Sequence, residues 1–474
     1  MMPHQEATAE TQLTPLPFLV LERAPWRDPV GVASALADAP FGVCLLSDGS
    51  GENGRWSYVT ADPDAVLTIG PDDARDAFAA LADFIGPAQS RDPGGPPFQG
   101  GVIGLAAYEL GERVERLGLE RRPGWPDLVC GRYSAVLAFD HERGEVLALG
   151  RGEAPEAARA AAAKALGWLS AVPAPPYPGR LCEALTGEAP ARHEAAVAAV
   201  TARIAGGEIF QANIARAWTG TLAAGARPFD LLARLAKMSP APFAAYLRLP
   251  GLALVSNSPE RFISVTSAGD GLTAQTRPIK GTAPRGATVE EDAANAAALL
   301  ASEKDRAENL MIVDLMRNDL SRVAAAGSVK TPALFTVESF ANVHHLVSTV
   351  TARLAAGRTA ADLLAAAFPP GSITGAPKVQ AMRVIADYEP PRGAFFGALF
   401  FAGCDGAFDS SVLIRTVAFE ETRGGWTFEA RAGGGVVADS DPVAERLETE
   451  AKIAAIAAAL TGRDDGRMIA GCTT

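Results

Sequence analysis

The chain is poor in cysteine and has no long apolar run. Its five cysteines form no CxxC pair and are scattered along the 474 residues, at Cys44, Cys130, Cys182, Cys404 and Cys472. Isolated cysteines in odd number are typical of reduced thiols, so they indicate a cytoplasmic protein rather than a secreted disulfide framework. No apolar stretch is long enough to span a bilayer. The N-terminus carries Glu6 and Glu10 and no apolar core, which a signal peptide would need.

Basic residues are outnumbered, since Lys and Arg total 43, Asp and Glu total 55, and the net charge is −12. This balance disfavours nucleic acid and membranes as partners, because both bind basic patches. An acidic protein can still bind an anionic small molecule through a metal ion or a few basic groups. With 48% hydrophobic and 21% charged residues, the composition is that of a globular protein. The length fits one large enzyme unit or two intimate halves.

In the first half of the chain, short apolar runs bounded by turn residues predict strands. The run at 18–21 is typical of a buried strand, and 43–46 predicts another. Two further runs, 134–139 and 145–149, predict a hairpin. Apolar spacing predicts helices over 74–85 and 154–169, with a loop at 86–97 and a glycine-rich stretch at 100–105 that can pack closely.

The proline-rich stretch 173–179 is the best candidate for a boundary, because it cannot be helical and lacks ladder donors. Beyond it, the pattern predicts five helices and three strands. The helices are expected at 193–204, 299–320, 361–368, 378–388 and 445–460, and the strands at 252–255, 397–403 and 411–419. There is no internal repeat and no regular βαβ alternation, which favours a mixed α+β fold.

One lysine stands in a stiff setting. Lys280 follows Pro278 and precedes Gly281, so proline restricts the backbone on one side and glycine allows a bend on the other. A lysine amine is a nucleophile once its pKa is lowered. Taken alone, the stretch is more often a surface loop with a solvated lysine.

Two helical segments carry carboxylates three residues apart. Asp305 and Glu308 form one pair, and Glu445 and Glu448 form the other, with Lys452 four residues further on. Residues at these spacings share a helix face. For either helix alone, a solvated charged face is the simpler interpretation. If the two faces meet, the four carboxylates need a cation, and Mg²⁺ takes one or two carboxylates directly.

Several further groups could hold an anion. The loop 369–378 opens a helix and offers free N–H groups with two hydroxyls, one of them from Ser372. The glycines at 433–435 are expected to end a strand and expose backbone donors. Arg415 lies in an apolar run, and a buried arginine needs a carboxylate partner from the protein or a ligand. His345 is weaker evidence, because a lone histidine is more often structural.

With these motifs in order, the chain resembles the chorismate-utilising enzymes, a family that includes anthranilate, aminodeoxychorismate, isochorismate and salicylate synthases. The resemblance is strong over 192–460 and looser through 100–117. It is carried by seven motifs, at 208–213, 258–260, 278–282, 311–320, 375–378, 414–416 and 437–442.

Two positions favour one branch of that family. The water-adding branches have lysine where this chain has Gln211, and anthranilate synthases usually have alanine where it has Lys280. Aminodeoxychorismate synthases resemble this chain at Lys280. The run linked to tryptophan feedback is also absent, with Glu22 and Arg23 in its place. Phe395 stands where many relatives have tyrosine, which removes one hydroxyl from the expected substrate contacts.

The resemblance implies two large, mostly antiparallel sheets packed as a sandwich with helices outside. It implies a β-rich half at 1–172 that contributes to the shared sandwich, a chorismate-binding catalytic region at 180–462 and a tail at 463–474. The expected activity is that of a synthetic subunit converting chorismate and ammonia to 4-amino-4-deoxychorismate, with ammonia from a separate glutamine amidotransferase subunit. The alternatives are anthranilate synthase component I and a non-catalytic chorismate-binding regulator.

The resemblance also implies roles for individual residues. Lys280 would be the nucleophile and Glu260 the general acid. Glu308 and Glu448 would bind Mg²⁺ directly, with Asp305 and Glu445 in its outer shell. The residues expected to hold the substrate are Gln211, Thr282, His345, Ser372, Arg415, Gly433, Gly434 and Lys452.

Overall fold

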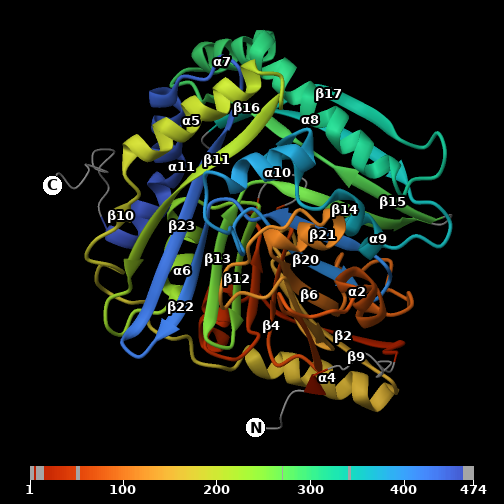
Figure 1. Cartoon of the computed structure of the whole chain (residues 1–474). Helices are drawn as coiled ribbons and strands as arrows, with labels where there is room; N and C mark the ends of the chain where they lie inside the picture. Colours follow the sequence, from red (N-terminus) through yellow and green to blue (C-terminus); the bar gives the residue numbers. More distant parts are fainter. Residues whose placement is uncertain (1–4, 7–14, 50–53, 269–270, 340–342, 463–474) are drawn as a thin grey trace.

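The computed structural model describes residues 5–6, 15–49, 54–268, 271–339 and 343–462. Two large β-sheets form the centre of the molecule, and helices cover their outer sides (Figure 1). The described strands pair antiparallel, apart from the short β1 with β5. The α+β sandwich expected from the sequence is therefore confirmed.

The first sheet has 11 strands within the described residues. In spatial order they are β1 (Gln5–Glu6), β5 (Ala65–Ile69), β7 (Leu128–Tyr133), β6 (Gly101–Ala106), β20 (Ala398–Gly403), β21 (Phe408–Val412), β14 (Arg261–Ala268), β15 (Gly271–Thr276), β18 (Val343–Arg353) and β16 (Ile279–Pro284), with β17 (Lys330–Ser339) also paired to β18.

The second sheet has 12 described strands. In order they are β10 (Thr186–Gly187), β11 (Gln211–Thr221), β23 (Gly425–Val436), β22 (Thr416–Thr422), β13 (Leu252–Ser258), β12 (Phe243–Leu249), β3 (Val43–Leu46), β4 (Trp56–Thr60), β8 (Ala135–Asp140), β9 (Glu145–Gly152) and β2 (Phe18–Pro25), with β19 (Gly375–Ala376) paired to β11.

Both sheets draw strands from both sides of the proline-rich stretch 173–179. In the first sheet β6 pairs with β20, and in the second β3 pairs with β12. The two sheets share one apolar core, in which Ile103 of β6 and Leu254 of β13 are both buried. Neighbouring residues of β13 point the other way, since Ala253 and Val255 belong to a second core beneath the outer helices. The division of the chain at 172 and 180 stays a prediction.

The described helices are α1 (Pro29–Leu36), α2 (Ala77–Ile85), α3 (Glu112–Glu115), α4 (Pro155–Trp168), α5 (Pro190–Ala205), α6 (Pro228–Met238), α7 (Val289–Ala301), α8 (Glu303–Ser321), α9 (Ala360–Ala367), α10 (Lys378–Ala386) and α11 (Pro442–Thr461), with 3₁₀ turns at Tyr108–Gly111 and Gly371–Ile373. Side chains cap some of the described helices, such as α2, α8 and α11, whereas α4, α5 and α10 begin without a side-chain cap. The Asp441 side chain accepts a hydrogen bond from the N–H of Ala444, and Pro442 fills the first turn of α11. None of the helices in the described ranges is both long and apolar enough to cross a membrane.

Three local predictions were wrong. The helix expected at 299–320 is two helices, because Ser302 is extended and its side chain caps α8 by accepting from the N–H of Asp305. The strand expected at 411–419 is likewise divided between β21 in one sheet and β22 in the other. The run at 18–21 is not buried, because β2 is an edge strand and Phe18 is 43% exposed.

The four described cysteines, Cys44, Cys130, Cys182 and Cys404, are buried free thiols. Burial raises the pKa of the Cys130 thiol far above its usual value, so it stays protonated. Cys472 and the expected tail at 463–474 lie outside the described residues.

Candidate functional site

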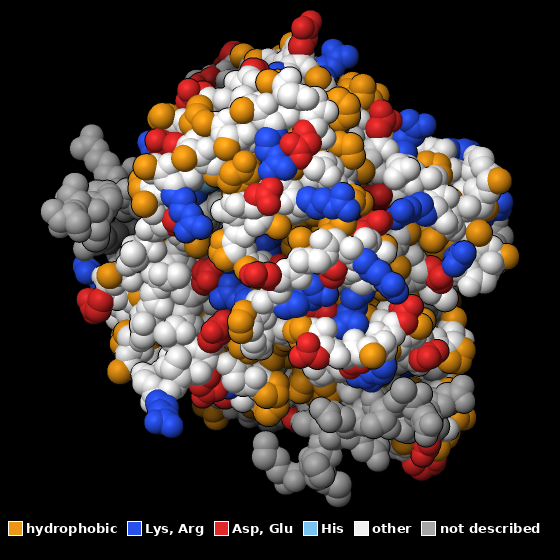
Figure 2. Space-filling model, viewed as in Figure 1, with side chains coloured by type: hydrophobic (Ala, Val, Ile, Leu, Met, Phe, Trp, Pro, Cys, Tyr) orange, Lys and Arg blue, Asp and Glu red, His pale blue; other side chains and the backbone are white. Residues whose placement is uncertain are grey.

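A cavity of about 630 Å³ brings together most of the residues selected from the sequence. Its walls come from β11, β16, β18, β23, α8 and α11 and from the turn before β19. The selected residues that line it are Glu260, Lys280, Thr282, Asp305, Glu308, His345, Ser372, Arg415, Gly433, Glu445, Glu448 and Lys452. The cavity therefore collects titratable groups that are far apart in the chain. On the molecular surface, Figure 2 shows charged side chains of both signs interspersed over the face seen in Figure 1.

Lys280 projects into this cavity from β16, which pairs with β18. Gly281 beside it has φ +82°, and an added Cβ would lie 3.0 Å from the Asp305 carboxylate. The glycine therefore permits both the bend and the close approach of α8. Burial lowers the pKa of the Lys280 amine, although Glu308 and Glu260 oppose the shift. Burial therefore favours the neutral, nucleophilic form of this amine.

Glu260 is 8% exposed and follows β13 in the turn before β14. Burial raises the pKa of its carboxyl group, despite the Ser372 hydrogen bond and the positive charges of Lys280 and Lys452. The Ser372 hydroxyl donates to Glu260 Oε1 at 2.7 Å. Ser372, predicted to hold the substrate, thus contacts the predicted general acid, and its contact with the substrate stays a prediction.

Gln211 does not line the cavity but lies directly behind it. Its side chain is fully buried, and neither amide atom has a hydrogen-bond partner within the described chain. A Cβ added at Gly435 would lie 2.7 Å from Gln211 Nε2 and 3.3 Å from Lys280 Nζ. Any larger residue at this point of β23 would displace the ends of these side chains.

The two carboxylate pairs face the same cavity from α8 and α11. Burial raises the pKa of Glu308, and the negative charges of Asp305 and Glu448 add to that effect. Burial likewise raises the pKa of Glu445, although a hydrogen bond from Ser440 opposes it. Among the described residues, no three His, Cys, Asp or Glu side chains lie close enough together to hold a metal ion. The donor set is nevertheless oxygen-only, as Mg²⁺ requires, and it gathers negative charge that a cation would offset.

Lys452 supplies part of the positive charge that offsets these carboxylates. Its Nζ lies 2.6 Å from Glu448 Oε1 and donates to the carbonyl oxygen of Gly433 at 2.8 Å. Burial disfavours the charged form of Glu448, but Lys452, with Lys280 and Lys304, outweighs that effect and lowers the Glu448 pKa. A metal bound by Glu448 would have to compete with this ion pair.

The glycine run lies at the end of a strand, as expected, because β23 ends at Val436. Gly433, Gly434 and Gly435 lie within β23 and pair with β11. A Cβ at Gly434 would lie 2.7 Å from Glu445 Oε2. These glycines therefore let α11 and the cavity side chains approach the sheet. The expected role of their backbone N–H groups as donors to an anion stays a prediction.

Arg415 also differs from its prediction, because it lies in the crossover between β21 and β22 rather than in a strand. Its φ is +49°, a left-handed conformation that few residues other than glycine adopt. Burial lowers the pKa of its guanidinium. No carboxylate of the described residues forms an ion pair with it, so a half-buried cation faces the cavity without a counter-charge from this part of the chain.

Thr282 and His345 occupy neighbouring positions on β16 and β18. The Thr282 hydroxyl and His345 Nδ1 share a hydrogen bond of 2.9 Å. Burial, with the positive charge of Arg415 adding to it, lowers the pKa of His345 to about 4. The imidazole is therefore neutral at physiological pH.

Phe395 does not line the cavity, and its ring lies beneath the guanidinium groups of Arg122 and Arg431.

Four polar residues of the cavity were not selected from the sequence: Asn213, Lys304, Arg392 and Arg431. Asn213 belongs to a motif that carries the resemblance, and Arg392 follows two prolines, but neither position indicates burial by itself. A smaller cavity of about 150 Å³ lies between the sheets and contains none of the selected residues.

The protein thus has two packed sheets and a polar cavity whose lining includes strands of both sheets and helices α8 and α11. Residues 43–458 match the model of the chorismate binding enzyme family. Aminodeoxychorismate synthase component 1 of Klebsiella aerogenes is 44% identical over 362 residues, covering 75% of this chain and 76% of that protein. Anthranilate synthase component 1 of Thermus thermophilus is 36% identical, covering 92% of this chain and 96% of that protein.

Among solved structures, anthranilate synthase component I of Streptococcus pneumoniae superposes with a TM-score of 0.71 at 27% identity, covering 95% of each chain. This chain belongs to the chorismate binding enzyme family.

Proposed function

We propose that this protein is the synthetic subunit of an aminodeoxychorismate synthase, converting chorismate and ammonia to 4-amino-4-deoxychorismate. The observation that carries the proposal is a lysine amine in the cavity whose pKa burial lowers, near a carboxyl group whose pKa burial raises. The Klebsiella aerogenes relative bears the name of this activity. The designation of that relative as component 1 also supports a second component, which we propose is a glutamine amidotransferase that supplies ammonia.

In the proposed reaction, neutral Lys280 forms a bond from Nζ to ring C2 as the C4 hydroxyl group leaves. Glu260 donates its proton to that oxygen, so the group departs as water. Ammonia then bonds to C4, and the bond between C2 and Lys280 breaks, which returns the neutral amine. The new C4 ammonium group loses one proton, which restores the protonated form of Glu260. The chain's own residues thus supply the nucleophile and the acid, and the enolpyruvyl ether is untouched.

Substrate carboxylates would fill the charges that the cavity leaves open. Arg415 is the first candidate, since it has no carboxylate partner within the described residues. Lys452 is the second, because it can exchange its contact with Glu448 for a ligand. Glu308 and Glu448 would hold Mg²⁺, with Asp305 and Glu445 further out. When bound, Mg²⁺ would neutralise a substrate carboxylate and increase the electron demand of the ring.

The second candidate is anthranilate synthase component I, favoured by the Thermus thermophilus relative that matches over 96% of its length. A product assay separates the two. The protein is incubated with chorismate, Mg²⁺ and an ammonium salt at alkaline pH, and the products are separated by chromatography. We expect 4-amino-4-deoxychorismate, identified by mass and by conversion to para-aminobenzoate with an added lyase.

Direct accumulation of fluorescent anthranilate would instead support the second candidate. Tight chorismate binding without turnover, also with glutamine and the amidotransferase partner added, would mean a non-catalytic regulator. A parallel reaction without Mg²⁺ measures how far either product depends on the metal.

A further inference from the structure

Arg392 is a buried arginine of the cavity that the proposed reaction does not use. It lies between α10 and β20 and is 2% exposed. Its Nη1 donates to the carbonyl oxygen of Ile373 at 3.1 Å, and its Nη2 donates to that of Asn213 at 2.8 Å. One guanidinium therefore ties together two walls of the cavity, β11 and the turn at 371–374.

The guanidinium itself is held firmly. Glu389 accepts from Arg392 Nε and Nη2, both at 2.9 Å, and also from the N–H of Ala215 at 2.7 Å. The rings of Tyr108 and Phe396 lie 4.6 and 4.5 Å from the guanidinium carbon. A planar fork with this many fixed partners has little freedom to move.

The turn held by Arg392 carries Ser372. The Asn213 side chain donates to the carbonyl oxygens of Ser372 at 3.2 Å and Thr374 at 3.3 Å. Together with the Arg392 bond to Ile373, this anchors three successive carbonyl groups. The Ser372 hydroxyl leaves the same turn and donates to Glu260 at 2.7 Å.

We propose that Arg392 is a positioning residue for catalysis, and that it keeps the Ser372 hydroxyl on the Glu260 carboxyl group by fixing the turn at 371–374. The inference rests on the proposed function, in which Glu260 is the general acid. Arg392 does not touch the reacting atoms and acts through Ser372. Lysine cannot replace it, because a single Nζ cannot reach Glu389, Ile373 and Asn213 at once.

The test is a double-mutant cycle on the full chain, with Arg392→Lys, Ser372→Ala and the double variant. Each single substitution should lower kcat about tenfold, the order expected for a lost hydrogen bond to an ionisable group, with KM within about twofold. Because both act through one contact, the double variant should be no slower than Ser372→Ala alone. Multiplying effects, or a change in KM alone, would contradict the inference.

Arg151→Lys is the matched control. Arg151 is 1% exposed and also donates to backbone carbonyl groups, those of Gln99, Leu16 and Ser90, but it does not line the cavity. It should lower the melting temperature and leave kcat unchanged. If it slowed turnover as much as Arg392→Lys, the effect would be general destabilisation, and the positioning role would be overturned.

A crystal structure of Arg392→Lys gives a readout independent of activity. The Ser372 Oγ to Glu260 Oε1 distance should exceed hydrogen-bond range, and an unchanged 2.7 Å contact would overturn the inference. Glu389→Gln is the milder variant if Arg392→Lys does not fold, and the same distance should lengthen in it. If the parent protein makes no product from chorismate, the proposed function fails, while this distance still decides whether Arg392 positions Ser372.

Discussion

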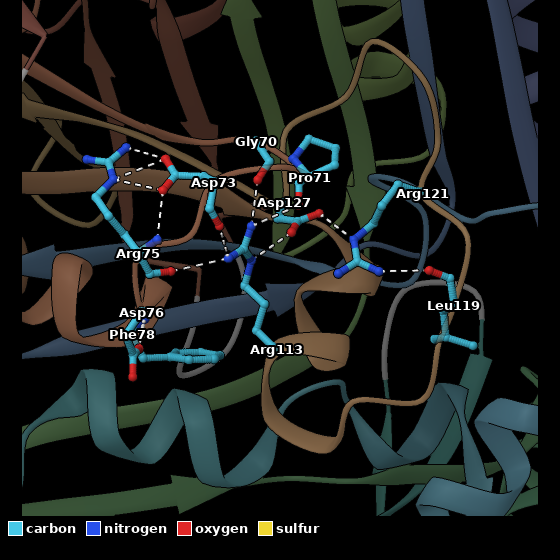
Figure 3. Close-up of polar contacts among 10 residues, drawn as sticks. All are labelled: Gly70, Pro71, Asp73, Arg75, Asp76, Phe78, Arg113, Leu119, Arg121 and Asp127. Atoms are coloured by element: carbon cyan, nitrogen blue, oxygen red, sulfur yellow. Dashed lines mark hydrogen bonds and ion pairs between the residues drawn. The ribbon is translucent and has the colours of Figure 1, made fainter.

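Two clusters of charged side chains differ in how their charges are balanced. Around Arg113 the charges are paired within the chain (Figure 3). Arg113 Nε donates to Asp127 Oδ2 at 2.8 Å, and its other nitrogens donate to the carbonyl oxygens of Gly70 and Asp73. Arg121 contacts the second oxygen of Asp127 at 3.1 Å. This network joins the loop after β5 to the segment before β7, and both arginines have a carboxylate partner in Asp127.

The candidate site also gathers charges of both signs, but part of its charge is unbalanced. Arg415 has no carboxylate partner among the described residues, and burial raises the pKa of Glu308 and Glu445. A buried charge without a partner costs stability. The comparison indicates that the first cluster stabilises the fold, whereas the second holds unfavourable charges, which the proposed function assigns to a ligand and a metal.

The largest expected effect is at the nucleophile. Lys280→Ala should lower the rate of 4-amino-4-deoxychorismate formation at least about a thousandfold, because the covalent route through the amine is lost. Circular dichroism should show an unchanged fold. The variant is also expected to admit some direct ammonia attack at C2, detected as anthranilate. A parental rate with the parental pH profile would show that Lys280 only binds or supports the site.

The second largest effect is expected when one of the predicted metal-binding carboxylates loses its charge. Glu448→Gln should reduce turnover by on the order of a hundredfold and abolish the Mg²⁺ dependence of chorismate binding, since an amide oxygen carries no negative charge. Calorimetric titration of chorismate with and without Mg²⁺ measures this. Near-normal activity of the variant without added metal would refute the assignment.

Arg113→Met probes the paired cluster. It should lower the free energy of unfolding by about 2 to 3 kcal/mol, because it leaves Asp127, which is 2% exposed, with one partner fewer. Urea unfolding measures the loss. Turnover should be unchanged, because Arg113 does not line the cavity. A large loss of activity in the folded variant would mean that the two clusters are coupled.

The sequence predicted those elements whose spacing and capping residues are visible in the local sequence. Helices such as α11 show clear spacing and caps, and their positions were predicted within a few residues. The break at Ser302 also had a signal, since Ser302 and Asp305 form a capping pattern. The division of 411–419 between two sheets had no such signal, because an apolar run looks the same whether it stays in one sheet or crosses to another.

The site shows the same limit. The local pattern selected Lys280 and the carboxylate pairs, the resemblance added Glu260, and the fold brings them to one cavity. It could not indicate that Ser372 contacts Glu260, or that Arg392 braces the turn, because those contacts join segments far apart in the chain. Nor could it place Arg415 at a crossover with φ +49°. Such features depend on tertiary packing rather than on local pattern.

The smallest expected change in stability is at Arg415, and it tests the comparison of the two charged clusters most directly. Arg415→Met should raise the free energy of unfolding by about 1 kcal/mol, opposite in sign to Arg113→Met, because it removes a half-buried cation without a carboxylate partner in the described chain. Methionine keeps an unbranched side chain at the same φ, so backbone strain should be similar. The variant should bind chorismate at least about tenfold more weakly, since the ligand loses its charged partner. Urea unfolding and calorimetric titration give the two values on one preparation. A destabilised variant that still binds chorismate normally would show that Arg415 has a counter-charge within the protein, and that the cavity is balanced like the cluster around Arg113.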